Sequence, residues 1–445
     1  MIPRILGVGR LASGSYDSKE LEASIRALVA RQESESQHLE FKAAYPEKEK
    51  KDNDNFEFAK LVASIVNGGG GVIIYGIREG TGSLKDRATE IVPLPLTAKA
   101  KSLSEIVNTR IEPRLQTISF ASVPIEDEAA GLLLVEIAPS ARVPHALIDK
   151  VTGAVTYWKR AHTEKYPMAE SEVERMYSER WEAARIATTT IDQLRTRVLK
   201  HSETLEFPRI WIAAVPLSSR LRILRPVHES KQALLEISAR LMSLVDMTIL
   251  GHDAKIRLGR IGLSSGWPPR GYPDNDWSEI GDLGEFLAVH PTFDASLNPD
   301  VGAELQRDGV QHYFSRYFLF TRTLGSLVAL REIMKHFDIT GDLLLKYGIS
   351  GAWNHPLLSF ECGFRREGRI EEDVEGSAYV SIDHLLLPAK LGLLARQFLE
   401  DLLMAFGLPG TFWITAEGSI NAKAIDHRHK EDILRWCRAM MLRVE

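Results

Sequence analysis

The chain of 445 residues is poor in cysteine, with only Cys362 and Cys437, and these lie far apart in the sequence. Because no CxxC pair exists, we expect neither a thiolate zinc site nor a framework of disulfides. The sequence also lacks a GxxxxGK[ST] motif, and we therefore expect no ATP site.

Long apolar runs are missing as well. The first twenty residues, MIPRILGVGRLASGSYDSKE, hold one short apolar run that Gly, Ser and charged residues soon break, and no later stretch is apolar enough to span a membrane. We expect a cytoplasmic protein without membrane association.

A general excess of positive charge is absent, since the formal net charge is −5. Residues 1–200 contain 28 Lys and Arg and 28 Asp and Glu, so the acidic excess belongs to the rest of the chain. The first part is therefore electrostatically the better place to bind a phosphate.

The length exceeds what one hydrophobic core usually organises, and the 44% hydrophobic and 26% charged residues are normal for a folded protein. The mixed patterns predict an α/β (α+β) fold in two domains. We expect a loose arm over 1–17, a first domain over 18–185, a helical connector over 186–206 and a second domain of unknown type, a sensor or dimerisation unit, over 207–445.

In the first domain, hydrophobic periodicity predicts that Leu39 and Phe41 face one side of a strand and Glu40 and Lys42 the other. A hairpin turns at Thr152-Gly153. The other expected elements are helices over 18–32, 56–67, 102–111 and 169–185, a loop over 46–55, and strands over 71–77, 115–125 and 131–140.

In the second domain, the run 312–322 predicts a core strand with Arg316 at its edge. The aromatic loop 267–277 suits recognition, and His427 and His429 are expected to be solvated because residues two apart do not face each other on a helix. The remaining elements are a strand over 207–217 and helices over 228–246, 324–337, 389–407 and 430–442.

The glycine run NGGGG at 67–71 follows a helix and precedes a strand. Phosphate-binding glycines have the opposite order, because they place a helix N-terminus at the phosphate. The run therefore indicates a left-handed helix stop with close backbone packing.

The segment ESQHLEFK places Glu35 and Glu40 five residues apart, so their carboxylates converge only if the chain turns between them. With Lys42, such a set suits phosphodiester cleavage with Mg²⁺ or Mn²⁺. A polar strand face is the simpler interpretation of this spacing alone. Glu79, beyond the strand 71–77, would be a third carboxylate, and Arg78 beside it could contact phosphate. Taken alone, a turn at REGTG is the better interpretation of these residues.

The segment TYWKRAHTEK at 156–165 combines aromatic and basic residues, as surfaces that stack on bases and bind the phosphate backbone do. An exposed hairpin with one ring packed inward explains the same pattern equally well.

Taken in order, ESQHLEFK, FAKLVASIVNGGGGVIIYGIREG, IEPRL and YWKRAHTEKYPMAESEV resemble the Schlafen AlbA_2 domain over residues 33–180. This family is also described as divergent AAA and as DNA-binding. The resemblance implies a mixed sheet with flanking helices. Glu35 and Glu40 match the family's paired glutamates, and Glu79 stands where the nucleases have an aspartate.

The resemblance implies an endoribonuclease that uses Mg²⁺ or Mn²⁺ on structured RNA such as tRNA, as an effector of phage defence or stress. Glu35, Glu40 and Glu79 would hold the metal and Lys42 would assist. The expected contacts to nucleic acid are Arg78, Tyr157, Lys159, Arg160 and Lys165. The alternative is a non-catalytic DNA- or RNA-binding regulator, for example a homodimer with a sensor domain.

Overall fold

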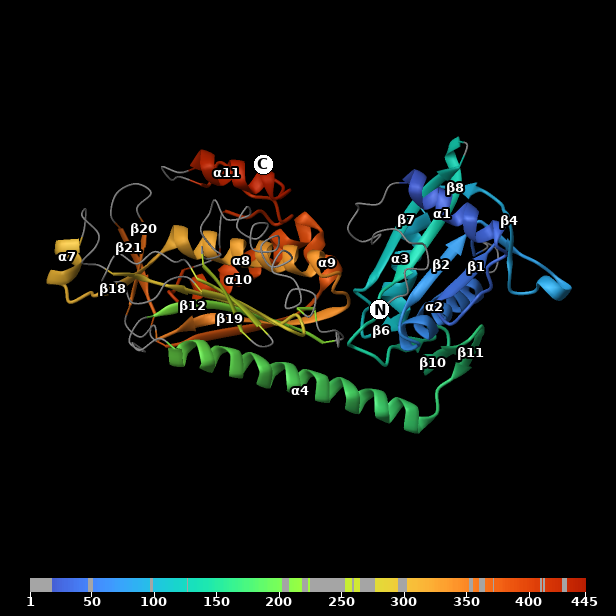
Figure 1. Cartoon of the computed structure of the whole chain (residues 1–445), viewed down its shortest axis with the longest axis horizontal. Coiled ribbons are helices and arrows are strands. Elements are labelled where there is room, and N and C mark those ends of the chain that lie inside the picture. The colour runs from blue at the N-terminus through green and yellow to red at the C-terminus, as the bar shows by residue number, and fades with distance from the viewer. Residues whose placement is uncertain are drawn as a thin grey trace. The chain divides into compact units, whose positions relative to one another are not determined.

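The computed structural model of the chain forms two compact units, and the architecture is α+β, as the sequence predicts. Unit 1 comprises Met1–Arg185 with Thr340–Asp342, and unit 2 comprises Ile186–Ile339 with Leu343–Glu445 (Figure 1). The structure describes residues 18–46, 51–96, 99–125, 127–201, 208–217, 223–224, 253–257, 260–264, 277–294, 302–351, 355–359, 365–370, 372–408, 410, 413–425 and 430–445.

The main sheet of unit 1 has the order β1-β2-β8-β5, and β7 pairs with β8. Strand β2 is central: it is parallel to β1 and antiparallel to β8. Apolar residues of helix α1 cover one face of this sheet, and those of helices α2 and α3 cover the other. The bounds are β1 (Leu39–Lys42), β2 (Gly71–Tyr75), β5 (Leu94–Pro95), β7 (Ile118–Ile125), β8 (Asp127–Ile137), α1 (Ser18–Ala30), α2 (Lys51–Asn67) and α3 (Lys99–Arg110).

Two smaller sheets complete unit 1. One has the order β11-β10-β9-β6, and α2 packs against its β10; the other is the hairpin of β3 and β4. Their bounds are β3 (Ile77–Glu79), β4 (Ala88–Ile91), β6 (Ile111–Glu112), β9 (Ala146–Ile148), β10 (Val155–Ala161) and β11 (Glu164–Pro167), with a 3-10 turn η2 (Gly82–Leu84).

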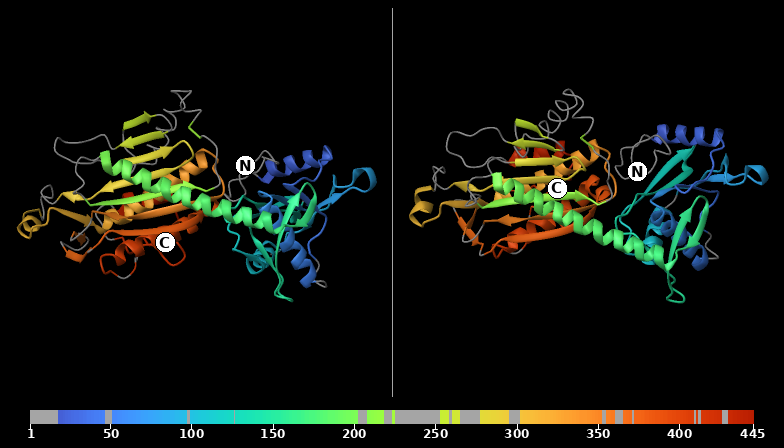
Figure 2. Two further views of the ribbon diagram at one scale, coloured as in Figure 1. Left: turned by 90° about the horizontal axis from the view of Figure 1, so that it is seen from below. Right: turned by 60° about the horizontal axis from the view of Figure 1, so that its bottom comes forward.

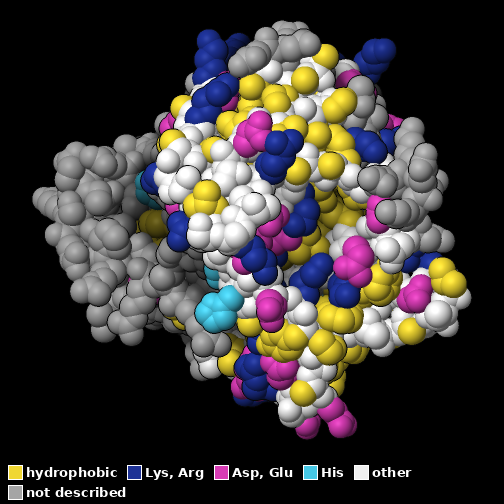
Figure 3. Space-filling view, turned by 90° about the vertical axis from the view of Figure 1, so that its right-hand side faces the viewer, with side chains coloured by type: hydrophobic (Ala, Val, Ile, Leu, Met, Phe, Trp, Pro, Cys, Tyr) yellow, Lys and Arg dark blue, Asp and Glu magenta, His cyan; other side chains and the backbone are white. Residues whose placement is uncertain are grey.

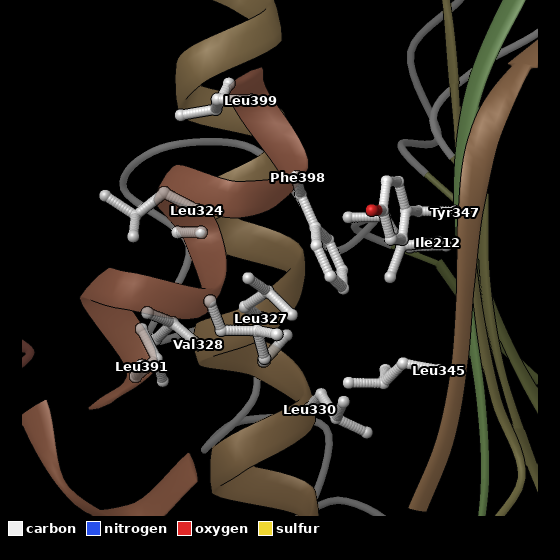
Figure 4. Packing of buried hydrophobic residues seen from close by; sticks show 14 of the residues in the cluster. Ile212, Leu324, Leu327, Val328, Leu330, Leu345, Tyr347, Leu391, Phe398 and Leu399 are labelled. Atoms are coloured by element: carbon white, nitrogen blue, oxygen red, sulfur yellow. The ribbon is translucent and has the colours of Figure 1, made fainter. Parts of the chain in front are cut away.

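The core of unit 2 lies between a sheet of order β13-β14-β15-β16-β12-β19-β22 and helices α8 and α10. Figure 4 shows Phe398 of α10 beside Tyr347 of β19, whose ring centroids are 3.6 Å apart. Ala187, Ile191 and Leu194 of helix α4 (Glu170–His201) pack on the other face, along which the green helix runs in Figure 2.

The strands of unit 2 are β12 (Arg209–Pro216), β13 (Asp253–Arg257), β14 (Arg260–Ser264), β15 (Trp277–Gly281), β16 (Phe286–Pro291), β17 (Phe293–Asp294), β18 (His312–Ser315), β19 (Asp342–Ser350), β20 (Pro356–Ser359), β21 (Arg365–Arg369) and β22 (Val374–Ser381). Strands β17, β18, β20 and β21 form a separate sheet. The helices are α7 (Gly302–Arg307), α8 (Arg316–His336), α9 (Ile382–Leu386), α10 (Pro388–Met404) and α11 (Lys430–Ala439). No helix in the described ranges is long and apolar enough to cross a membrane.

Three predictions for secondary structure were wrong. The run 312–322 is a strand only to Ser315, and Arg316 begins α8. Residues 51–55, expected in a loop, are the first turn of α2. The expected strand 71–77 is divided at Gly76, whose φ is +96°. The arm 1–17, the helix 228–246, residues 267–276 of the aromatic loop, His427 and His429 lie outside the described residues.

Candidate metal and nucleic-acid site

A tight turn brings Glu35 back against the strand that contains Glu40. Ser36 and Leu39 exchange backbone hydrogen bonds of 3.0 and 3.3 Å, which reverses the chain between them. The amide N–H of Phe41 then donates to Glu35 Oε1 over 2.8 Å. This is the turn that convergence of the two carboxylates requires.

The glycine run 67–71 packs against this turn through His38. Gly69 and Gly70 have φ values of +102° and +90°, so the predicted left-handed stop of α2 is confirmed. His38 Nδ1 lies 2.7 Å from the Gly70 carbonyl oxygen. A Cβ on Gly71 would lie 2.6 Å from the His38 carbonyl oxygen, so only glycine permits this approach.

The hairpin of β3 and β4 supplies two further carboxylates. Glu79 ends β3, and Asp86 lies in the connection to β4 with a φ of +59°. The amide N–H of Glu35 donates to the Asp86 carbonyl oxygen over 2.7 Å. A backbone bridge between Ser34 and Arg87 extends this contact. The main chain therefore holds Glu35 next to Asp86.

Glu35, Glu79 and Asp86 form the group suited to a cation. One carboxylate oxygen from each lies within 4.8 Å of the others, and all three residues are partly buried. Oxygens on opposite sides of an octahedral Mg²⁺ are about 4 Å apart, so the donor set fits Mg²⁺ or Mn²⁺ after small side-chain movements. Figure 3 shows basic and acidic side chains side by side near the middle of the face of unit 1 that it presents.

Glu40, which the resemblance assigns to the metal, lies outside this group and in two ion pairs. One oxygen contacts Arg160 Nη1, and the other lies 2.7 Å from Lys42 Nζ. Arg160 Nη2 also lies 3.6 Å from a Glu35 oxygen. Lys42 Nζ reaches Glu79 at 3.5 Å. Glu40 thus links the two cations that adjoin the carboxylate group.

Burial, followed by the negative charge of Glu40, raises the pKa of Glu35 to about 7. Burial alone would lower the pKa of Lys42, but the charges of Glu40, Glu35 and Glu79 outweigh it and raise that pKa. The charged ammonium group of Lys42 therefore lies in the same site as the carboxyl group of Glu35, whose ionisation is costly.

Asp86 is the site residue that sequence analysis missed. It falls in the segment REGTGSLKDR, where no periodicity marks a position. Its proximity to Glu35 arises from a backbone hydrogen bond between two residues that are 51 positions apart in the sequence. The only local signal is that an aspartate tolerates the left-handed conformation it adopts in this loop.

The side chains expected to bind nucleic acid are all engaged within unit 1. Arg78 pairs with Glu90, Lys159 lies 3.6 Å from Glu172, and Lys165 lies 3.3 Å from Glu57. The Tyr157 hydroxyl is 3.1 Å from that of Tyr177. Arg160 has no exposed side-chain area, so it is a member of the carboxylate site and cannot meet a phosphate on the surface.

Comparison with known proteins adds one match. No curated protein and no solved structure matches the chain. The model of the family described as Schlafen, AlbA_2 matches residues 35–169, a segment that begins at Glu35 and includes Glu40, Glu79, Asp86 and Arg160. Residues 35–169 of the chain thus form a Schlafen AlbA_2 domain.

Proposed function

We propose that unit 1 is a divalent-metal-dependent endoribonuclease that hydrolyses structured RNA such as tRNA. The observation that supports this most directly is the convergence of Glu35, Glu79 and Asp86 beside Lys42. The family of the domain is the second support.

Electrostatics favour a cation at this place. Burial and the nearby charge of Glu40 raise the pKa of Glu35 to about 7, and Glu79 adds to that effect. A cation among the three carboxylates would offset their repulsion and favour the ionised form of Glu35.

Each side chain then has a task in hydrolysis. Glu35, Glu79 and Asp86 would hold Mg²⁺ or Mn²⁺, which when bound supplies positive charge at the scissile phosphate and acidifies water. Lys42, with 38% of its side chain exposed, would offset charge on the phosphate. Glu40 would keep Lys42 and Arg160 in position.

The test is cleavage of tRNA by the purified protein in Mn²⁺. Removing a side chain that hydrogen-bonds to a metal ligand commonly costs about 10- to 100-fold in activity or metal affinity. Glu79→Gln and Asp86→Asn change the proposed ligands themselves, so each should lower the cleavage rate by at least about tenfold. Asparagine suits the left-handed backbone at position 86. The matched control is Glu90→Gln, an exposed carboxylate on β4 of the same hairpin, which should cleave like the parent.

Glu40→Ala is a less direct test, because it leaves the buried Arg160 without its principal partner. Its activity should be measured beside its stability. If Glu40→Ala is folded and cleaves as fast as the parent, Glu40 has no part in the reaction.

The alternative is a regulator that binds DNA or RNA without cleaving it. The ion pairs of Glu40 with Lys42 and Arg160 favour it, because they already neutralise part of the site. Binding in EDTA with a steep salt dependence, together with no cleavage in Mn²⁺ or Mg²⁺, would support this alternative.

A further inference from the structure

Two lysines near the carboxylate site share one acidic partner. Glu57 of α2 accepts hydrogen bonds from Lys60 Nζ at 3.2 Å and from Lys165 Nζ at 3.3 Å. Lys60 Nζ also lies 3.9 Å from the centroid of the Trp158 ring. The Glu57 side chain is 45% exposed, whereas those of Lys60 and Lys165 are 17% and 29% exposed. The carboxylate is the most exposed group of the three, and the cluster has an excess of one positive charge.

Strand register places this cluster next to the carboxylates. Lys165 on β11 is directly opposite Arg160 on β10, so the two side chains share a face of the hairpin. Trp158, two residues before Arg160, lies on the same face. Arg160 contacts both Glu40 and Glu35. Lys159 lies on the opposite face, 3.6 Å from Glu172.

We propose that Lys60 and Lys165 form a subsite for an RNA phosphate, and that Glu57 is a displaceable anion within it. The choice of RNA rests on the proposed function. The two oxygens of Glu57 bridge the two ammonium groups as two phosphate oxygens would. The Glu57 carboxylate is 45% exposed, so water solvates it in place of the lysines and its displacement by a phosphate costs little. The Trp158 ring holds the Lys60 ammonium in place by a cation–π contact.

The proposal predicts a gain of binding from a single substitution. In Glu57→Gln, both lysines lose their competitor, and labelled tRNA should bind about two- to fivefold more tightly in EDTA. Glu172→Gln is the matched control: it makes the same change in net charge and releases Lys159 on the opposite face. The subsite predicts that the affinity of this variant for tRNA equals that of the parent, whereas a role of Lys159 in RNA binding would make the variant bind more tightly.

Loss of either lysine should have the opposite effect. Lys60→Gln and Lys165→Gln should each weaken tRNA binding and lower the slope of log affinity against log salt by about one. Fluorescence anisotropy at several salt concentrations measures both quantities. Circular dichroism of each variant checks that it is folded.

Two results would overturn the subsite: Glu57→Gln binding no more tightly than the parent, or Glu172→Gln tightening binding as much as Glu57→Gln does. Absence of tRNA binding by both parent and Glu57→Gln would overturn it too. EDTA separates this test from cleavage. If Glu57→Gln binds tRNA more tightly than the parent but the parent does not cleave tRNA in Mn²⁺, the subsite is retained and the nuclease function is rejected. If the parent cleaves tRNA and Glu57→Gln binds it no more tightly, the nuclease function is retained and the subsite is rejected.

Discussion

At the scale of single residues, Arg160 decides how the carboxylates of unit 1 are arranged. Its side chain has no exposed area, its Nε donates to the His162 carbonyl oxygen, and its guanidinium contacts Glu40 and Glu35. A buried arginine requires such partners because an unpaired buried charge is costly. Arg160 therefore joins β10 to β1.

We expect the contributions of Arg160 and Glu40 to stability to be strongly coupled. Arg160→Met and Glu40→Gln should each lower the free energy of unfolding, by at most about 3–5 kcal/mol, because each removes the main partner of a buried charge. Lys42 beside Glu40 and Glu35 beside Arg160 offset part of that loss. The double variant should lose clearly less than the sum of the two. Urea unfolding followed by circular dichroism measures all four proteins; additive losses would show that the contact has little energetic weight.

Glu35 should make stability depend on pH. Its pKa is about 7 in the folded protein against 4.5 ordinarily, so between these values the folded state binds more protons. The contribution of Glu35 to stability is then largest below pH 4.5 and falls as the pH rises towards 7. Glu35→Gln is neutral throughout and keeps an acceptor for the Phe41 amide.

The variant should therefore gain stability relative to the parent from pH 5 to 7, by at most about 3 kcal/mol, and no more above pH 8. Thermal unfolding in EDTA across this range is the measurement. A constant difference between the two proteins would contradict the elevated pKa.

At the scale of elements, sequence patterns predicted the parts of unit 1 whose burial alternates. Leu39 and Phe41 belong to the core on the α1 side, whereas Glu40 and Lys42 enter the site, as the period of two indicates. The helix predicted over 324–337 is present, but residues 316–322, in the first turns of α8, were wrongly expected to be strand. Residues 319–323 are all buried, so no amphipathic period marks this part of the helix.

Site geometry was less predictable than the strands. Glu79 reaches the group of Glu35, but Asp86 joins it through a backbone bridge that no local pattern encodes. Arg160 is buried because it meets Glu40, 120 residues earlier in the chain. Pairings over such distances depend on the whole fold.

The turn between α2 and β2 permits a comparison of two glycines. Both Gly69 and Gly70 have positive φ, but a Cβ on Gly70 would lie 2.6 Å from the Ile137 carbonyl oxygen, whereas one on Gly69 has only the His38 ring at 3.8 Å. Gly69→Ala should cost about 1–2 kcal/mol of stability from its conformation alone.

Gly70→Ala should cost more than Gly69→Ala, because a steric clash adds to the same conformational penalty. Chemical denaturation gives the two values. Equal losses would mean that the backbone around Ile137 moves aside at little cost.

At the scale of the whole molecule, the chain has two compact units with separate cores. The main core of unit 2 includes Leu327 and Phe398, and those of unit 1 are built around α1 and α2. We therefore expect each unit to unfold cooperatively around its own core. The division between Arg185 and Ile186 falls within helix α4.

Calorimetry should therefore resolve two unfolding transitions. Leu327→Ala creates a cavity in unit 2 and should lower one transition, with a loss of about 2–5 kcal/mol. Excess Mn²⁺ should raise the other transition, and Glu79→Gln should abolish that shift. A single transition that responds to both changes would show that the units unfold together.

The backbone contact between Glu35 and Asp86 has a consequence for how the site can vary. Two of its three carboxylates are spaced by main-chain geometry, whereas Glu79 follows a register shift in β3 and reaches the others through its own side chain. Shortening that side chain in Glu79→Asp would enlarge the site without disturbing the other pair. A substitution at position 79 can thus change the size of the divalent cation that the site prefers.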